Sequence, residues 1–368
     1  MSAASTDVQN KGGSCPRPFS FVLCCAAVVL ASGCRGRAPT PVKPPVQSGT
    51  ASEPHQPRPT PASLRNYEEV IALPDQDFDL AEAVLVLGEE IGAQRDGLES
   101  LKQLDALATA AKEELPLAPD TLDYIDALYA TVLDRKAAQP FREDRAEDYD
   151  LGFTISKRRG TCLSAGILVL AVARRIGAPL YGAQAPGHFL LRSKPLKNGA
   201  AINFDVTRPM PDNWRKLDDD FFRRWYKFDE KTQAKAGYLS PLTDKQVLAI
   251  YLASRSGFLA TRGEFEPALR DAQRAQQLHP QNPTAALNAG YALESLSRWK
   301  EAEAAYRRAL DIDGGSVRTL NNLAYLKVRA PKSEVFDPKE AERIIASALK
   351  LEPIRAYLHA TLAEVKAA

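Results

Sequence analysis

The stretch RRGTCLSAG, residues 158–166, decides the fold of this chain. A Gly-Thr turn precedes Cys162, and the run LSAGILVLAVA that follows stays apolar on all sides until Arg174. A helix that is hydrophobic all round lies buried inside a domain, and Gly177 fits the glycine that commonly ends a helix. The sequence therefore predicts a helix through the middle of a domain, with Cys162 in its first turn.

Predicted helices and strands flank this central helix. Downstream, the runs GHFLLR (187–192) and AINFDVT (201–207) have the composition of strands, and an Asn-Gly turn signal lies between them. Upstream, apolar residues at helical spacing predict three helices, which begin near Asp79, Leu98 and Ile125. Helices, then a central helix, then strands indicate an α+β domain.

From about Val247 the sequence repeats itself. PALRDAQRA at 267–275 aligns with EAEAAYRRA at 301–309, a shift of 34, and EAERIIASA at 340–348 is a third copy displaced by 39. A 34-residue helix-turn-helix period resembles the tetratricopeptide repeat, and RAYLHATLAEV is predicted to cap the last pair. The concave surface of such a solenoid is predicted to bind a protein or peptide ligand.

The N-terminal segment has the features of an export signal. Lys11 and Arg17 precede the apolar run FVLCCAAVVL, and small residues precede Cys34. The run is shorter than the roughly 20 residues of a membrane-spanning helix. A signal that ends on a cysteine after small residues resembles the lipobox of bacterial lipoproteins, which implies a lipid on Cys34. Arg35 after that cysteine resembles the outer-membrane sorting pattern, so we expect a protein exported and lipid-anchored to the periplasmic face of the outer membrane.

These features divide the chain into four predicted parts. They are a lipoprotein signal peptide at 1–33, a proline-rich tether at 34–62, the α+β domain at 63–246 and the repeats with a capping helix at 247–368. The tether carries eight prolines between Gly36 and Ala62, a composition typical of extended linkers. A formal net charge of +2 gives no reason to expect nucleic acid as a partner.

Cysteine and histidine are both sparse in the α+β domain. Between residues 63 and 246 the only ones are Cys162 and His188. A structural zinc site needs about four such ligands, so we expect no metal and no cofactor there. One cysteine and one histidine are what thiol catalysis needs, because the thiolate attacks and the imidazole moves the proton. The positive end of a helix stabilises a thiolate in its first turn, and the amide of Cys162 could hold an oxyanion.

The second predicted strand supplies a third group. Its alternating pattern puts Asn203 and Asp205 on the same face, where either side chain could orient an imidazole on a neighbouring strand. A carboxylate stabilises an imidazolium better than an amide does. We therefore predict Asp205 as the orienting residue and keep Asn203 as the alternative.

The motifs RRGTCLS, APGHFLLR and INFDVT together resemble the transglutaminase-like superfamily, whose triad runs Cys, His, Asp in that order. The likeness is closer to the SirB1-type branch, through QLDALA, ARRIGAPLYG and the repeats behind the core, and it covers roughly residues 64–366. The resemblance implies a papain-like α+β core in which Cys162 is the nucleophile, His188 the base and Asp205 the orienting acid. This chain reads FDVT where the superfamily often has FDPT.

Two functions remain open. The first is a cysteine hydrolase or acyl transferase acting on an amide bond, with water or an amine resolving the thioester. The second is a non-catalytic scaffold in which the repeats bind a partner. Cys162 is then a packed side chain, and Asp205 is a turn carboxylate or pairs with Arg192 or Arg208. The segment RRWYKFDEK at 223–231 is interpreted as solvated, lining the groove at most through its Trp or Tyr.

Overall fold

A computed structural model describes residues 63–92, 96–116, 122–133, 149–195, 201–207 and 218–368. The predicted signal peptide and the whole predicted tether, which begins at Cys34, lie outside these ranges. Among the residues that the structure describes, none of the helices combines the length and the apolar character needed to cross a bilayer.

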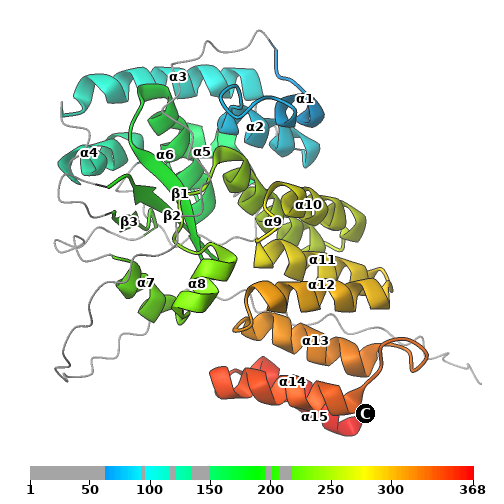
Figure 1. Ribbon diagram of the computed structural model, residues 1–368. Coiled ribbons are helices and arrows are strands. Elements are labelled where there is room, and N and C mark those ends of the chain that lie inside the picture. The colour runs from blue at the N-terminus through cyan, green and yellow to red at the C-terminus, as the bar shows by residue number, and fades with distance from the viewer. Residues whose placement is uncertain (1–62, 93–95, 117–121, 134–148, 196–200, 208–217) are drawn as a thin grey trace, which may run out of the picture. The chain divides into compact units, whose positions relative to one another are not determined.

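The helices of the core precede its sheet and surround one central helix (Figure 1). They are α1 (Tyr67–Ile71), α2 (Leu80–Glu90), α3 (Gly97–Glu114), α4 (Leu122–Val132), α5 (Leu151–Lys157) and α6 (Cys162–Ile176). The helix predicted from the opening stretch is α6, and every residue from Cys162 to Ala173 in it is buried. It ends at Gly177, whose φ of 72° is the left-handed conformation that glycine favours at a helix end.

Three antiparallel strands follow α6 in the order β1-β2-β3. They are β1 (Leu180–Ala185), β2 (His188–Ser193) and β3 (Asn203–Phe204). Strand β1 was not among the predicted strands, and the second predicted run pairs through only two residues. Pro186 and Gly187 form the tight turn between β1 and β2, with Gly187 at φ 68°, a conformation that suits glycine after proline in such a turn. This turn places His188 at the start of β2.

The two faces of the sheet pack against different helices. Phe189, Leu191 and Phe204 join the large core that contains α6. On the other face Leu190 packs with Phe222 of α7 (Asp219–Tyr226), which is followed by α8 (Glu230–Ala236). The predicted α+β core is confirmed, with the sheet between α6 and α7.

The rest of the chain is helical and keeps the predicted period. The helices are α9 (Asp244–Thr261), α10 (Phe265–Leu278), α11 (Pro283–Ser295), α12 (Trp299–Ile312), α13 (Val317–Arg329), α14 (Pro338–Leu351) and α15 (Ala356–Ala367). The starts of α10 and α12 are 34 residues apart, and those of α12 and α14 are 39 apart, since 338 − 299 = 39. The extra residues lie in the turn between α13 and α14. The predicted helical repeats are confirmed, and α15 packs on the last pair.

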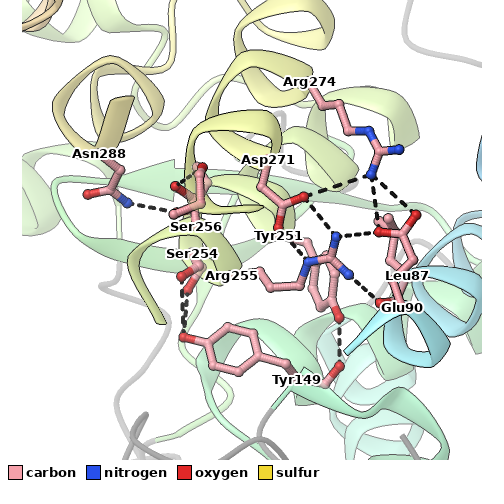
Figure 2. A network of polar contacts seen from close by, with 12 residues as sticks. Leu87, Glu90, Tyr149, Tyr251, Ser254, Arg255, Ser256, Asp271, Arg274 and Asn288 are labelled. Carbon is pink, nitrogen blue, oxygen red and sulfur yellow. Dashed lines mark hydrogen bonds and ion pairs between the residues drawn. The ribbon is translucent and has the colours of Figure 1, made fainter. Parts of the chain in front are cut away.

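Helix α9 belongs to both parts, because it starts before residue 247 and packs on the core as well as on α10. The guanidinium of Arg255 in α9 is almost fully buried and donates from Nε and Nη2 to Asp271 of α10 at 2.6 and 2.8 Å. Its Nη2 also donates to Glu90 of α2 at 2.9 Å, and its Nη1 donates to the carbonyl of Leu87. Figure 2 shows this network, in which one side chain joins α2, α9 and α10.

Candidate active site

Cys162 is the first residue of α6, and a capping box holds it there. Thr161 accepts a hydrogen bond from the Ser164 amide at 3.2 Å, and Ser164 Oγ accepts one from the Thr161 amide at 3.0 Å. The turn before the helix passes so close that a Cβ on Gly160 would meet Ser164 Oγ at 2.3 Å, which explains the glycine of RRGTC. The thiol therefore lies at the positive end of the helix, in a residue that is 8% exposed.

His188 lies between Cys162 and Asp205. Its Nε2 is 3.0 Å from Asp205 Oδ2, and the two side chains are 13% and 5% exposed. The nitrogen is within hydrogen-bonding distance but outside the directions of a well-aligned hydrogen bond, so the contact is a close ion pair. The imidazole also interacts with the thiol of Cys162. Because Nε2 faces the carboxylate, Nδ1 is the ring nitrogen left to face the thiol.

The charges of these groups depend on one another. Burial disfavours the imidazolium, but the Cys162 and Asp205 side chains favour it, and together they raise the pKa of His188 well above its usual value. Burial also opposes ionisation of Asp205, whereas the interactions with His188 and Thr207 lower its pKa to about 2. The arrangement can therefore keep a positive imidazolium between two acidic groups at neutral pH.

Asp205 is fixed by its own turn. Its Oδ1 accepts hydrogen bonds from the Thr207 amide at 3.0 Å and from the Thr207 hydroxyl at 2.6 Å. These bonds leave Oδ2 facing the imidazole. Among the described residues Asp205 has no ion pair with Arg192, which pairs with Asp219 at 2.6 Å instead. The other predicted partner, Arg208, lies outside the described residues.

Asn203 does not approach His188. It is opposite Arg192 in the β2–β3 register, and its side chain accepts from Arg192 Nη1 at 2.8 Å and donates to Asp219 at 2.9 Å. Of the two candidates for the orienting residue, the structure therefore brings only Asp205 to the imidazole. Asn203 instead connects the sheet to the first turn of α7.

From the sequence, the segment 223–231 has no role beyond lining the groove through Trp225 or Tyr226, and the position of the Tyr226 ring beside His188 was not predicted. Tyr226 of α7 stacks on the imidazole with ring centroids 5.6 Å apart and an interplanar angle of 21°. Most of the segment 223–231 is exposed or half-buried, as a solvated segment would be, and Tyr226 is the residue of it that lies beside the site. The tyrosine in RRWYKFDEK was the available signal, but nothing in the local pattern shows which residue it meets.

No group of three or more His, Cys, Asp or Glu side chains in the described ranges is arranged to hold a metal ion. A cavity of about 510 Å³ lies elsewhere, where α2, α9 and α10 meet, and Glu90, Arg255 and Arg274 are among its lining residues. Its lining includes none of the three predicted site residues. The candidate site is thus a group of side chains at the end of the sheet, separate from this cavity.

Comparison with known families agrees with the geometry of the core. The sequence model of the transglutaminase-like superfamily matches residues 99–253. This match includes Cys162, His188 and Asp205, and its last residues lie in α9. The chain therefore contains a transglutaminase-like domain. The finer assignment to the SirB1-type branch stays a prediction.

Curated relatives match parts of the chain. A UPF0162 protein of Xylella fastidiosa is 27% identical over 146 residues, which is 40% of this chain and 52% of the relative. A UPF0162 protein of Pseudomonas aeruginosa is 26% identical over 218 residues, covering 55% of this chain and 72% of the relative. The chain spans about half the length of the Xylella relative.

Several solved structures of helical repeat domains are similar to about a third of this chain. The second TPR domain of human RPAP3, solved with an HSP70 peptide, is 20% identical and covers 33% of this chain and 98% of its own, with a TM-score of 0.30. The TPR domain of Arabidopsis OM64 is 19% identical, with the same coverage and a TM-score of 0.31. The repeat assignment for this chain rests on its own period and helix packing.

Proposed function

We propose that the transglutaminase-like domain is a cysteine hydrolase or acyl transferase that acts on an amide bond. The observation that carries this proposal is the position of His188, which contacts Asp205 through Nε2 and interacts with Cys162, at the start of a buried helix. A thiolate beside an imidazolium is the form in which a cysteine attacks an acyl carbon.

Each residue then has one task in the reaction. The Cys162 thiolate adds to the amide carbonyl carbon, and the oxyanion that forms is stabilised at the N-terminus of α6, where the first amides have no acceptor within the helix. The C–N bond breaks as the His188 imidazolium gives its proton to the leaving nitrogen, which leaves a thioester on Cys162. Water or an amine then attacks this thioester, His188 removes its proton, and the thiolate is regenerated.

Asp205 does not exchange a proton in this scheme. With a pKa of about 2 it stays a carboxylate throughout the neutral range, where it holds the imidazole orientation and stabilises the imidazolium. The thioester partner, water or an amine, decides whether the reaction is hydrolysis or acyl transfer. The three residues are the same for both.

The pH dependence of Cys162 alkylation tests this function. The rate of reaction with iodoacetamide is measured on the full chain by mass spectrometry of the peptide that contains Cys162, so the other cysteines do not interfere. We expect rapid alkylation below pH 7 that is lost in His188→Ala and kept in His359→Ala, a histidine exposed on α15. A slow reaction with an ordinary thiol midpoint near pH 8.5, unchanged by His188→Ala, would contradict catalysis and favour the non-catalytic scaffold.

We also propose that Cys34 carries a lipid that anchors the protein to the outer membrane, and that the repeats bind a protein or peptide partner. The export signal, the proline-rich tether and the 34-residue period support these two proposals. Cys34→Ser should release the protein from the membrane fraction. Retention of this variant in that fraction would contradict the lipid anchor.

A further inference from the structure

The last turn of α7 lies over the imidazole of the candidate site. Tyr226 is the final residue of this helix, and its ring is nearly parallel to that of His188 at a centroid distance of 5.6 Å. Tyr226 also stacks on Phe222, with ring centroids 6.2 Å apart and an interplanar angle of 5°. Phe222 is buried against the sheet. The tyrosine ring is thus supported from within its own helix.

The opposite end of α7 is anchored to the sheet. Asp219 in its first turn accepts from Arg192 of β2 at 2.6 Å and from Asn203 of β3 at 2.9 Å. A helix fixed by ion pairing at its start and by the buried Phe222 in its middle holds its last residue in a defined place. Contacts outside the candidate site therefore contribute to holding Tyr226 in place.

We propose that Tyr226 is a positioning residue, whose ring fixes the plane of the His188 imidazole so that Nε2 meets Asp205 while Nδ1 faces Cys162. This inference rests on the function proposed above and extends it. Both nitrogens lie in the ring plane, so rotation of the imidazole out of that plane weakens both contacts at once. A parallel aromatic ring resists that rotation, and its face also attracts the positive charge of an imidazolium.

The groups around His188 allow the effect of the aromatic ring to be measured apart from the effect of the acidic groups. Cys162 faces it from α6, Asp205 from the end of β3 and Tyr226 from α7. Of these three described neighbours, Tyr226 is the one that contributes no full charge. Replacing it with a residue of similar bulk therefore changes the ring face and leaves the two acidic groups in place.

The test compares Tyr226→Leu with Tyr226→Phe in the full chain. The His188 ring is titrated by NMR, and Cys162 alkylation is followed from pH 5 to 9. Loss of the ring face should lower the His188 pKa by about half a unit and slow alkylation at pH 6 about threefold. Tyr226→Phe should match the wild type, because it keeps the ring. Phe221→Leu, on the same helix but stacked on Trp225, is the matched control and should not shift the titration.

Two results would overturn the positioning role: a His188 titration in Tyr226→Leu that equals the wild type, or an equal shift in Tyr226→Phe. If Tyr226→Leu does not fold, Tyr226→Met replaces it, because a flexible thioether fills a similar space. The function proposed above is judged separately by the wild-type alkylation profile. The NMR titration measures the effect of Tyr226 on His188 even if Cys162 is alkylated like an ordinary thiol.

Discussion

Two buried histidines show how differently the core and the repeats use the same side chain. His188 lies at the start of β2 with Asp205 and Cys162 beside it, and these groups raise its pKa well above the usual value. His279 caps the C-terminal end of α10 and has the amide of Gln184 at 3.4 Å. Burial lowers the pKa of His279 to about 4.

The difference lies in the charge of the neighbours. Burial disfavours the charged form of both rings, so without an anion a buried histidine is neutral at physiological pH. His279 follows this rule and acts as a packed, polar link between the repeats and β1. His188 departs from it because two acidic side chains face it. Burial of a histidine alone therefore does not indicate a catalytic role. Burial together with acidic partners does indicate one.

The first prediction reduces this distinction by removing one of the two acidic neighbours of His188. In Asp205→Ala the imidazolium loses its carboxylate, and an opposite charge this close is worth one to three pKa units. We expect the pKa of His188 to fall by about one to three units and Cys162 alkylation at pH 6 to slow about a hundredfold. NMR titration of the ring and mass spectrometry of the Cys162 peptide measure the two effects.

Asn203→Ala is the matched control for this prediction. It removes the polar side chain two residues before Asp205, which bonds Arg192 and Asp219 instead of the imidazole. We expect the His188 titration to stay within about 0.3 units of the wild type, less than the ring-stacking effect. If Asn203→Ala lowers the pKa as much as Asp205→Ala does, the roles of the two candidates must be exchanged.

The second prediction is a smaller one and concerns the pH dependence of stability that His279 causes. Because the folded-state pKa of His279 is about 4 and the unfolded value is near 6.5, the unfolded chain binds the proton first as the pH falls. The stability that neutral His279 provides is present above pH 6.5 and is lost between pH 6.5 and about 4. Lowering the pH from 7 to 4.5 should therefore reduce the free energy of unfolding by about 2 to 3 kcal/mol through His279.

Urea unfolding at the two pH values measures this loss. His279→Gln, which cannot titrate, should lose about 2 kcal/mol less than the wild type on acidification. His359→Gln, on the exposed surface of α15, should behave as the wild type does. An equal loss in His279→Gln and the wild type would show that the acid sensitivity has another origin.

The sequence predicted the parts of the fold that depend on long or repeated patterns. The apolar run after Cys162 predicted α6, and the 34-residue shift predicted the starts of α10 and α12. The order of Cys162, His188 and Asp205 along the chain also predicted which side chains form the candidate site. These signals are local or periodic, so a single sequence contains them in full.

What the sequence did not predict depends on contacts between distant residues. Strand β1, LYGAQA, lacks the alternation of a half-buried strand, because all six of its residues are buried. The choice between Asn203 and Asp205 depended on register, since both lie on the same face by alternation. The stacking of Tyr226 joins residues 38 positions apart (226 − 188), and no local pattern marks it.

The smallest expected effect tests whether a neutral partner sets a buried pKa at all. Gln184 donates to the carbonyl of Ala236 at 3.1 Å and is the polar side chain beside His279. In Gln184→Met the pKa of His279 should stay near 4, because burial and not the amide lowers it. The free energy of unfolding at pH 7 should fall by about 1 kcal/mol, since the Ala236 carbonyl loses its donor.

NMR titration and urea unfolding measure these values, with Gln273→Met, exposed on α10, as the control. A return of the His279 pKa to 6.5 would mean that the amide matters to this ring as Asp205 matters to His188, and the contrast between the two histidines would be lost.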